Sequence, residues 1–140
     1  TVTPDGEHVI VTGRAERTTG TRPYDVATVS YAAGTGSQQW ASTYDGADGV
    51  NDDGVDVVAA PDSSAVYVAA DLNGGRFGSQ FGALAYSPTT GSLLWKKAVK
   101  GSGVARSEGL SAAGGNLVIT GGGGPNAPQA DFFTVSLFAH

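Results

Sequence analysis

The densest group of side chains able to bind a metal lies in one glycine-rich stretch, DGADGVNDDGVD, which runs from Asp45 to Asp56. Carboxylate and amide oxygens on a loop that glycine allows to bend are the ligands that calcium prefers in proteins. We interpret this stretch as a solvated loop between two strands, with an irregular calcium loop as the alternative. The candidate ligands are Asp45, Asp48, Asn51, Asp52 and Asp53.

The acidic stretch does not follow the order of a known calcium loop. Asn51-x-Asp53-Gly54 resembles part of an EF-hand, but Gly49 occupies the first acidic position and no Glu follows at the far end. Outside this stretch, Asp25 and Asp131 each precede a β-branched run. For these two we expect a structural role, in which the carboxylate accepts backbone hydrogen bonds in a turn.

The residues that usually act as nucleophiles or bases are almost absent. There is no cysteine, which excludes disulfides, thiolate metal sites and cysteine nucleophiles within this chain. The two histidines, His8 and His140, have neither the spacing of a metal pair nor the partners of a catalytic triad nearby in the sequence. We therefore predict no catalytic residue and no organic cofactor, and calcium is the one cofactor that the sequence leaves open.

The charge pattern argues against a nucleic acid partner. The formal net charge is −5, and the eight basic residues are scattered. No apolar run approaches the ~18 residues that a membrane span needs. The nearest group of basic residues lies in GRAERTTGTRPYD, which we expect to be a loop that contacts a partner or is simply solvated. The residues of this predicted contact loop are Arg14, Arg17, Arg22 and Tyr24.

The elements that position these residues come from a repeat. The stretch TVSYAAGTGSQQW, residues 28–40, recurs as ALAYSPTTGSLLW, residues 83–95, at an offset of 55. The stretch PDGEHVIVTG recurs as PDSSAVYVAA, and GGNLVITGG is a further copy of its second half. DFFTVSLFA, residues 131–139, repeats DVATVSYAA, residues 25–33, at an offset of 106. The chain is therefore built from copies of one short β-rich unit.

Each unit has roughly the 50 residues of one four-stranded propeller blade. The 22 glycines interleave with short β-branched and aromatic runs, as expected for strands joined by tight turns. We predict an all-β chain, a single partial β-propeller of about two and a half blades. With strands a to d running outward from the propeller axis, the units are 1–44 (b, c, d), 45–100 (a, b, c, d) and 101–140 (a, b, c).

A partial ring implies partners. Closing a propeller takes at least four blades. We therefore expect the remaining blades to come from the same precursor or from other chains. An open stack would otherwise leave sheet edges and a blade face uncovered. The alternative is that the last blade is completed by a strand from the other terminus.

The second copy, AYSPTTGSLLW, resembles the tryptophan-docking motif of quinoprotein-like (PQQ-like) β-propellers, with Ser87 in place of an Asp. The first copy matches that motif at fewer positions. The rhythm of Asp25, TVxY, TG and W also resembles secreted bacterial propeller repeats. The resemblance implies that the two tryptophans pack between neighbouring blades. The implied docking residues are Trp40, Trp95, Gly36, Gly91, Thr35 and Thr90.

The resemblance also bears on activity. Quinoprotein-like dehydrogenases hold their cofactor over a Trp at the ring centre and use an adjacent disulfide and a calcium. This chain has no cysteine, and both tryptophans fall in the outer strand d. We therefore expect a non-catalytic scaffold, secreted or on the cell surface, that binds a protein or glycan. The alternatives are a piece of a propeller enzyme with its active site outside this chain, and a calcium- or sugar-binding propeller.

Overall fold

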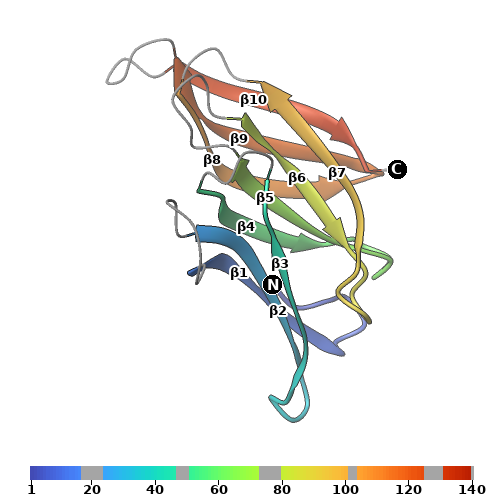
Figure 1. The fold of residues 1–140 in the computed structure, drawn as a ribbon. Coiled ribbons are helices and arrows are strands. Elements are labelled where there is room, and N and C mark those ends of the chain that lie inside the picture. Colours follow the sequence, from blue (N-terminus) through green and yellow to red (C-terminus); the bar gives the residue numbers. More distant parts are fainter. Residues whose placement is uncertain (17–23, 47–50, 73–79, 101–103, 125–130, 140) are drawn as a thin grey trace.

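The computed structural model of the chain consists of three antiparallel β-sheets stacked face to face (Figure 1). It describes residues 1–16, 24–46, 51–72, 80–100, 104–124 and 131–139. These residues contain ten strands and form no helix that could cross a membrane. The prediction of an all-β chain built from antiparallel sheets is confirmed. No sheet closes on itself within the described residues.

Strands that follow one another in the chain pair within each sheet. Sheet 1 contains β1 (His8–Glu16), β2 (Tyr24–Ala32) and β3 (Gln38–Tyr44). Sheet 2 contains β4 (Asp53–Ala59), β5 (Val66–Leu72), β6 (Gln80–Tyr86) and β7 (Leu93–Lys100). Sheet 3 contains β8 (Val104–Ala113), β9 (Asn116–Gly124) and β10 (Asp131–Phe138).

The residues before β1 add a short fourth element to sheet 1. Val2 forms an isolated bridge with Val9, and the Ile10 amide donates to the Thr1 carbonyl over 2.8 Å. The terminal ammonium of Thr1 donates back to the Ile10 carbonyl over 2.9 Å. The prediction gave this unit strands b, c and d, and sheet 1 contains the three strands β1, β2 and β3 besides this isolated bridge. Residues 1–3 pair along β1 at the position that β4 holds in sheet 2.

The two Thr-Gly turns adopt the same conformation. Gly36 and Gly91 have φ angles of 70° and 69°, in the left-handed region that glycine enters without a steric penalty. The Gly36 amide donates to the Ala32 carbonyl over 2.8 Å, and the Gly91 amide donates to the Ser87 carbonyl over 2.9 Å. The threonine hydroxyls repeat as well, because Thr35 and Thr90 each hydrogen-bond the serine two residues ahead. The repeated sequence therefore produces a repeated hairpin.

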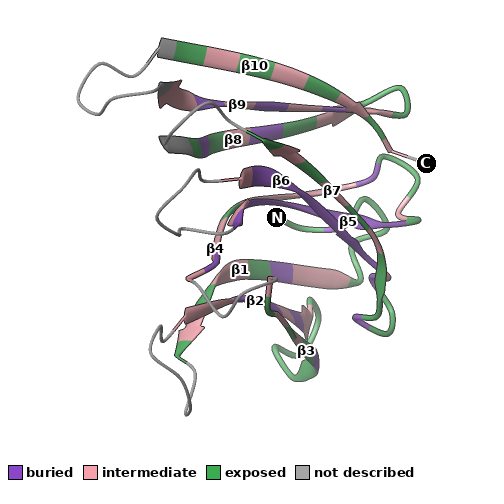
Figure 2. Ribbon diagram, turned by 45° about the horizontal axis from the view of Figure 1, so that its top comes forward, coloured by how far each residue is buried: buried purple, intermediate pink, exposed green. Residues whose placement is uncertain are grey.

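The central strands of sheet 2, β5 and β6, are buried on both faces (Figure 2). Strand β5 alternates its contacts: Val66 and Val68 pack toward sheet 1, whereas Tyr67 and Ala69 pack toward sheet 3. Alternate residues of a strand point to opposite faces, so a strand that is apolar throughout requires cover on both sides. Two separate cores result, one between each pair of neighbouring sheets. Sheet 1 contributes Ile10, Val26 and Trp40 to the first core, and sheet 3 contributes Leu110, Leu117 and Ile119 to the second.

Trp40, on β3, joins sheet 1 to sheet 2. Its side chain is 8% exposed, and its Nε1 donates a hydrogen bond of 2.6 Å to the Pro88 carbonyl in the turn before β7. The indole also stacks on Tyr86, whose pKa is raised to about 12 by burial. The neighbouring Ser42 hydroxyl donates to the Gly91 carbonyl over 2.5 Å. Trp40 therefore docks onto the Thr-Gly turn of the next sheet.

Trp95, on β7, lies at the corresponding place between sheets 2 and 3. Its ring centroid is 5.7 Å from that of Tyr67, and it packs against the second core. In contrast to Trp40 it is only partly buried, and the Lys97 ammonium lies 4.9 Å from its ring centroid. Both tryptophans thus lie between neighbouring sheets, and among the described residues a turn covers Trp40 alone.

The close approach of Gly91 to Trp40 generates a matched pair of substitutions. A Cβ atom on Gly91 would lie 2.5 Å from the Trp40 ring, whereas a Cβ on Gly36 would meet nothing within 4 Å. Both glycines have the same left-handed φ, so Gly36→Ala should cost only the backbone strain of about 1–2 kcal/mol. Gly91→Ala should cost about 1–3 kcal/mol more, because the Trp40 ring must move. Urea unfolding of both variants measures the difference. Equal losses of unfolding free energy in the two variants would show that the Trp40 ring does not pack against Gly91.

Candidate functional site

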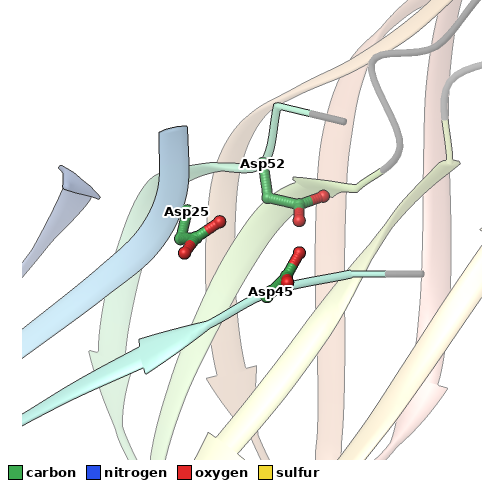
Figure 3. A group of neighbouring side chains, drawn as sticks. All are labelled: Asp25, Asp45 and Asp52. Atoms are coloured by element: carbon green, nitrogen blue, oxygen red, sulfur yellow. The ribbon is translucent and has the colours of Figure 1, made fainter. Parts of the chain in front are cut away.

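Three aspartates gather at one end of sheet 1: Asp25, Asp45 and Asp52 (Figure 3). One carboxylate oxygen of each lies within 4.8 Å of the others. Figure 3 shows the three carboxyl groups converging from the start of β2, the end of β3 and the segment before β4. Asp52 is fully buried, Asp25 is half-buried and Asp45 is exposed. The cluster therefore reaches from the interior to the surface.

The sheet register brings these residues together. Val26 pairs with Tyr44 across β2 and β3, so the next positions, Asp25 and Asp45, fall opposite each other. The chain then returns to the start of β2, where the Asp52 amide donates to the Tyr24 carbonyl over 2.9 Å. Asp52 is held from its other side, because its Oδ2 accepts a hydrogen bond of 2.6 Å from the Gly46 amide.

Gly46 is required for this approach. A Cβ atom at this position would lie 2.9 Å from both carboxylate oxygens of Asp52. Glycine therefore lets the backbone after β3 come within hydrogen-bond distance of a buried carboxylate.

The chemistry of the cluster fits a hard cation with oxygen ligands. Calcium takes six to eight oxygens, and carboxylates serve it as one- or two-oxygen ligands. The residue before Asp52 offers a further oxygen of a suitable kind, because the Asn51 Oδ1 is buried and has no hydrogen-bond partner among the described residues. Three carboxylates this close also repel one another unless a cation or a shared proton offsets their charge.

The aspartate cluster overlaps only partly with the predicted ligand set. Asp45 and Asp52 are in the cluster, but Asp53 lies on β4, where its Oδ1 is 3.7 Å from Nη1 of Arg14. Asp48 lies outside the described residues. Asp25 was not among the predicted ligands, because its place before a β-branched run predicted a structural role in a turn. The signal that could have found it is the hairpin alignment of strands c and d, which sets Asp25 opposite Asp45.

The predicted contact loop is shorter than its sequence suggests. β1 continues through Glu16 and β2 begins at Tyr24, so Arg14 and Tyr24 lie in strands. The Arg14 guanidinium carbon is 4.5 Å from the centroid of the Tyr24 ring. Arg17 and Arg22 lie outside the described residues. The structure thus brings together Arg14, Tyr24 and Asp53 near the end of sheet 1 that also carries the aspartate cluster.

Two other aspartates link sheet 2 to sheet 3. Asp71 on β5 accepts hydrogen bonds at one oxygen from the Ser107 amide, over 2.7 Å, and from the Ser107 hydroxyl, over 2.8 Å. Asp56 on β4 accepts a bond of 2.8 Å from the Leu110 amide. All three bonds reach β8 beside its bulge, where the register shifts between Ser107 and Gly109. The two carboxylates accept hydrogen bonds from backbone amides that the irregular strand would otherwise leave without a partner.

Burial dominates the titration of Asp71. Removal from water raises the pKa of its carboxyl group, while the Ser107 hydrogen bonds and the nearby Arg106 act in the opposite direction. Asp71 was not predicted from the sequence. The signal for it is an acid within the otherwise apolar run VYVAADL.

Comparisons of this chain with family models, curated proteins and solved structures give no match. Its function must therefore be inferred from the geometry of the chain itself.

The raised pKa of Asp71 makes a prediction about pH. The ionised form is less favourable in the folded chain than in the unfolded one, so stability should fall as pH rises from below 3.8 through the folded pKa. Asp71→Asn keeps an acceptor for Ser107 and cannot ionise. The free energy of unfolding of this variant, relative to the original chain, should therefore increase over that pH range.

Asp71→Ala is the companion variant. It removes the acceptor of both Ser107 bonds and should cost about 1–3 kcal/mol at every pH. Urea unfolding at a series of pH values measures both variants. If the original chain instead became more stable than Asp71→Asn as pH rises, the effect of the Ser107 hydrogen bonds on the pKa of Asp71 would exceed the effect of burial.

Proposed function

We propose that the chain is a section of a quinoprotein-like β-propeller that serves as a rigid, non-catalytic scaffold outside the cell and binds a protein or glycan. The observation that carries the proposal is the docking of Trp40 on the Thr-Gly turn of the next sheet. The resemblance of the sequence to docking-motif propellers implies this kind of contact between neighbouring blades. A stack of sheets from a repeated unit is the arrangement that such blades require.

The ends of the stack support the existence of further blades. The outer face of sheet 3 carries Phe132 and Phe138 at 72% and 68% exposure. On sheet 1, Val11 is 52% exposed, although Ile10 beside it is buried against sheet 2. Apolar side chains gathered on an open face mark a surface that another protein element covers. In this proposal the cover is the remaining blades.

The packing of the tryptophans favours a scaffold over an enzyme. A flat redox cofactor needs an open aromatic surface, whereas Trp40 is enclosed between two sheets and hydrogen-bonded to Pro88. In the alternative, a propeller enzyme, the active site would have to be built by residues outside this chain. Rigid sheets with variable loops at their ends suit binding, because the sheets hold the loops in fixed positions.

The mass of the native particle tests the scaffold proposal. We expect sedimentation at near-neutral pH to show the 14.0 kDa chain within a larger particle, because its end faces need cover. Replacing Phe132 and Phe138 by Ser should weaken the association, while Leu94→Ser, at an exposed residue of β7, serves as the matched control. A cooperatively folded monomer would contradict the proposal of missing blades. Quinone-dependent oxidation of an alcohol by the particle would contradict the non-catalytic role.

A second candidate function is calcium binding, and the gathering of Asp25, Asp45 and Asp52 favours it. In this proposal the cation ties the start of β2, the end of β3 and the segment before β4 to one another. The cation would stabilise the connection between sheet 1 and sheet 2, because β2 and β3 belong to sheet 1 and the segment before β4 leads into sheet 2. The buried Asn51 oxygen is a further donor of the type that calcium accepts.

Thermal unfolding with and without calcium tests this candidate. A ligand at about one hundred times its Kd adds about 2.7 kcal/mol of stability, so the melting temperature should rise with calcium and less with magnesium. Asp45→Asn, at the exposed member of the cluster, should reduce the rise. Asp62→Asn makes the same charge change on an exposed acid outside the cluster and should leave the rise unchanged. No rise in the original chain would exclude a stabilising calcium site.

A further inference from the structure

Strand β7 differs from the rest of the chain in charge. Although the net charge is −5, every lysine of the sequence lies on β7, at positions 96, 97 and 100, and the strand contains no acid. Sheet 2 is the middle sheet of the stack, and β7 is its outer strand (Figure 1). No strand among the described residues pairs with the outer edge of β7. β7 therefore offers a cationic edge in an otherwise acidic chain.

The lysines divide between the two faces of sheet 2. Lys97 reaches sheet 3, where its ammonium donates to the Phe138 carbonyl. Lys96 points the other way and donates a hydrogen bond of 3.0 Å to the Tyr44 hydroxyl of sheet 1. An ammonium has three donors, so Lys96 keeps two besides this bond. Lys100 shares the face of Lys96, because an even number of residues separates them, and both side chains are exposed.

The counterpart strand β3 shows that the repeat does not require this charge. β3 is likewise the outer strand of its sheet. With the two tryptophans aligned, the positions equivalent to Lys96 and Lys100 carry Ala41 and Asp45. The two residues before Trp95 are exposed leucines, where the first copy has glutamines. The cationic and apolar surface of β7 is therefore a feature of this strand alone among the two.

Lysines on an edge strand discriminate between possible partners. If two copies of β7 paired with each other, lysines of like charge would come together, which destabilises a sheet. A strand with carboxylates opposite Lys96 and Lys100 would instead gain two pairs of opposite charge. The backbone of β7 can pair with either partner, so the side chains decide between them. The charge of β7 thus favours an acidic strand over a second copy of this chain.

We propose that the outer edge of β7 binds an extended acidic peptide segment as a fifth strand of sheet 2. Carboxylates four residues apart in the segment lie opposite Lys96 and Lys100, and a β-branched residue between them lies opposite Ala98. Backbone hydrogen bonds supply most of the affinity, and the two lysines select the acidic sequence. The inference rests on the proposed scaffold function, because it names the chemistry of a protein segment that such a scaffold binds.

The peptide TETVTET is the probe, because it spaces two glutamates four residues apart with a valine between them. In the chain labelled with ¹⁵N-lysine, every labelled backbone amide lies on β7. Successive amides of a strand point to opposite edges, so the open edge receives either Lys97 alone or Lys96 and Lys100 together. At about 1 mM probe, we expect hydrogen exchange of that outward set to slow about threefold or more. The other set already faces β6 and should not change.

Matched controls test the role of charge. Lys100→Gln should weaken binding about two- to fivefold, as read from the remaining lysine signals. Arg106→Gln removes the same charge from an exposed residue of β8 and should leave binding unchanged. The peptide TKTVTKT reverses the charges, and TTEVETT keeps the composition of the probe but sets its glutamates two residues apart. Both peptides should slow exchange less than the probe does.

Slower exchange of one lysine set, weakened by Lys100→Gln and absent with TKTVTKT, supports the docking edge. No slowing, equal slowing by TTEVETT, or equal slowing along β3 in a uniformly labelled chain would overturn it. Slowing that grows with chain concentration without any probe would show that a second copy occupies the edge, and would also overturn the proposal. Sedimentation tests the end faces of the stack, whereas this experiment reads the middle sheet, so the two proposals fail separately.

Discussion

The structure depends on the burial of both faces of sheet 2. β5 and β6 place apolar residues on each face, and neither face can be left in water without a large cost, at roughly 25 cal/mol for each Å² of apolar surface. Sheet 2 therefore requires sheet 1 on one face and sheet 3 on the other to cover its apolar residues. The other contacts between the sheets set how the sheets are oriented within the stack that this burial requires.

Directional contacts fix how the sheets sit on one another, because apolar burial alone has no direction. Between sheets 1 and 2, the contact is the Trp40 indole in the turn that contains Gly91. Between sheets 2 and 3, Asp71 and Asp56 hold the bulge of β8 by its amides. The directional contacts described for the two interfaces thus differ in chemistry and in position. Asp71 and Asp56 give the second interface polar bonds of defined direction.

Much of the fold could be predicted from the sequence, since the repeat alone places most of the strands and both Thr-Gly turns. The exceptions have physical reasons. Residues 1–3 are too few to show a strand pattern, and only the hydrogen bonds to β1 reveal their pairing. Arg14 lies in a strand rather than a loop because β1 and β2 pair well past the apolar part of their sequences.

The aspartate cluster marks the limit of what the sequence could predict about the site. A contiguous loop suggested Asp45, Asp48, Asn51, Asp52 and Asp53, whereas the described cluster takes one residue from each of three segments. Local sequence cannot show that Asp25 faces Asp45, because the register of β2 on β3 sets that contact. Burial of Asp52 is likewise a property of the packed chain, since the Gly46 amide reaches it only after β3 has paired.

The sequence by itself determined the all-β unit, its turns and its tryptophans, because alternation of apolar residues and the positions of glycine are local properties of the chain. The tertiary structure decided which carboxylates meet and which tryptophan is enclosed. Those outcomes depend on register and on the stacking of sheets, which bring together residues far apart in the sequence. A repeated sequence therefore specifies equivalent elements, but only packing makes Trp40 a closed contact and leaves Trp95 partly open.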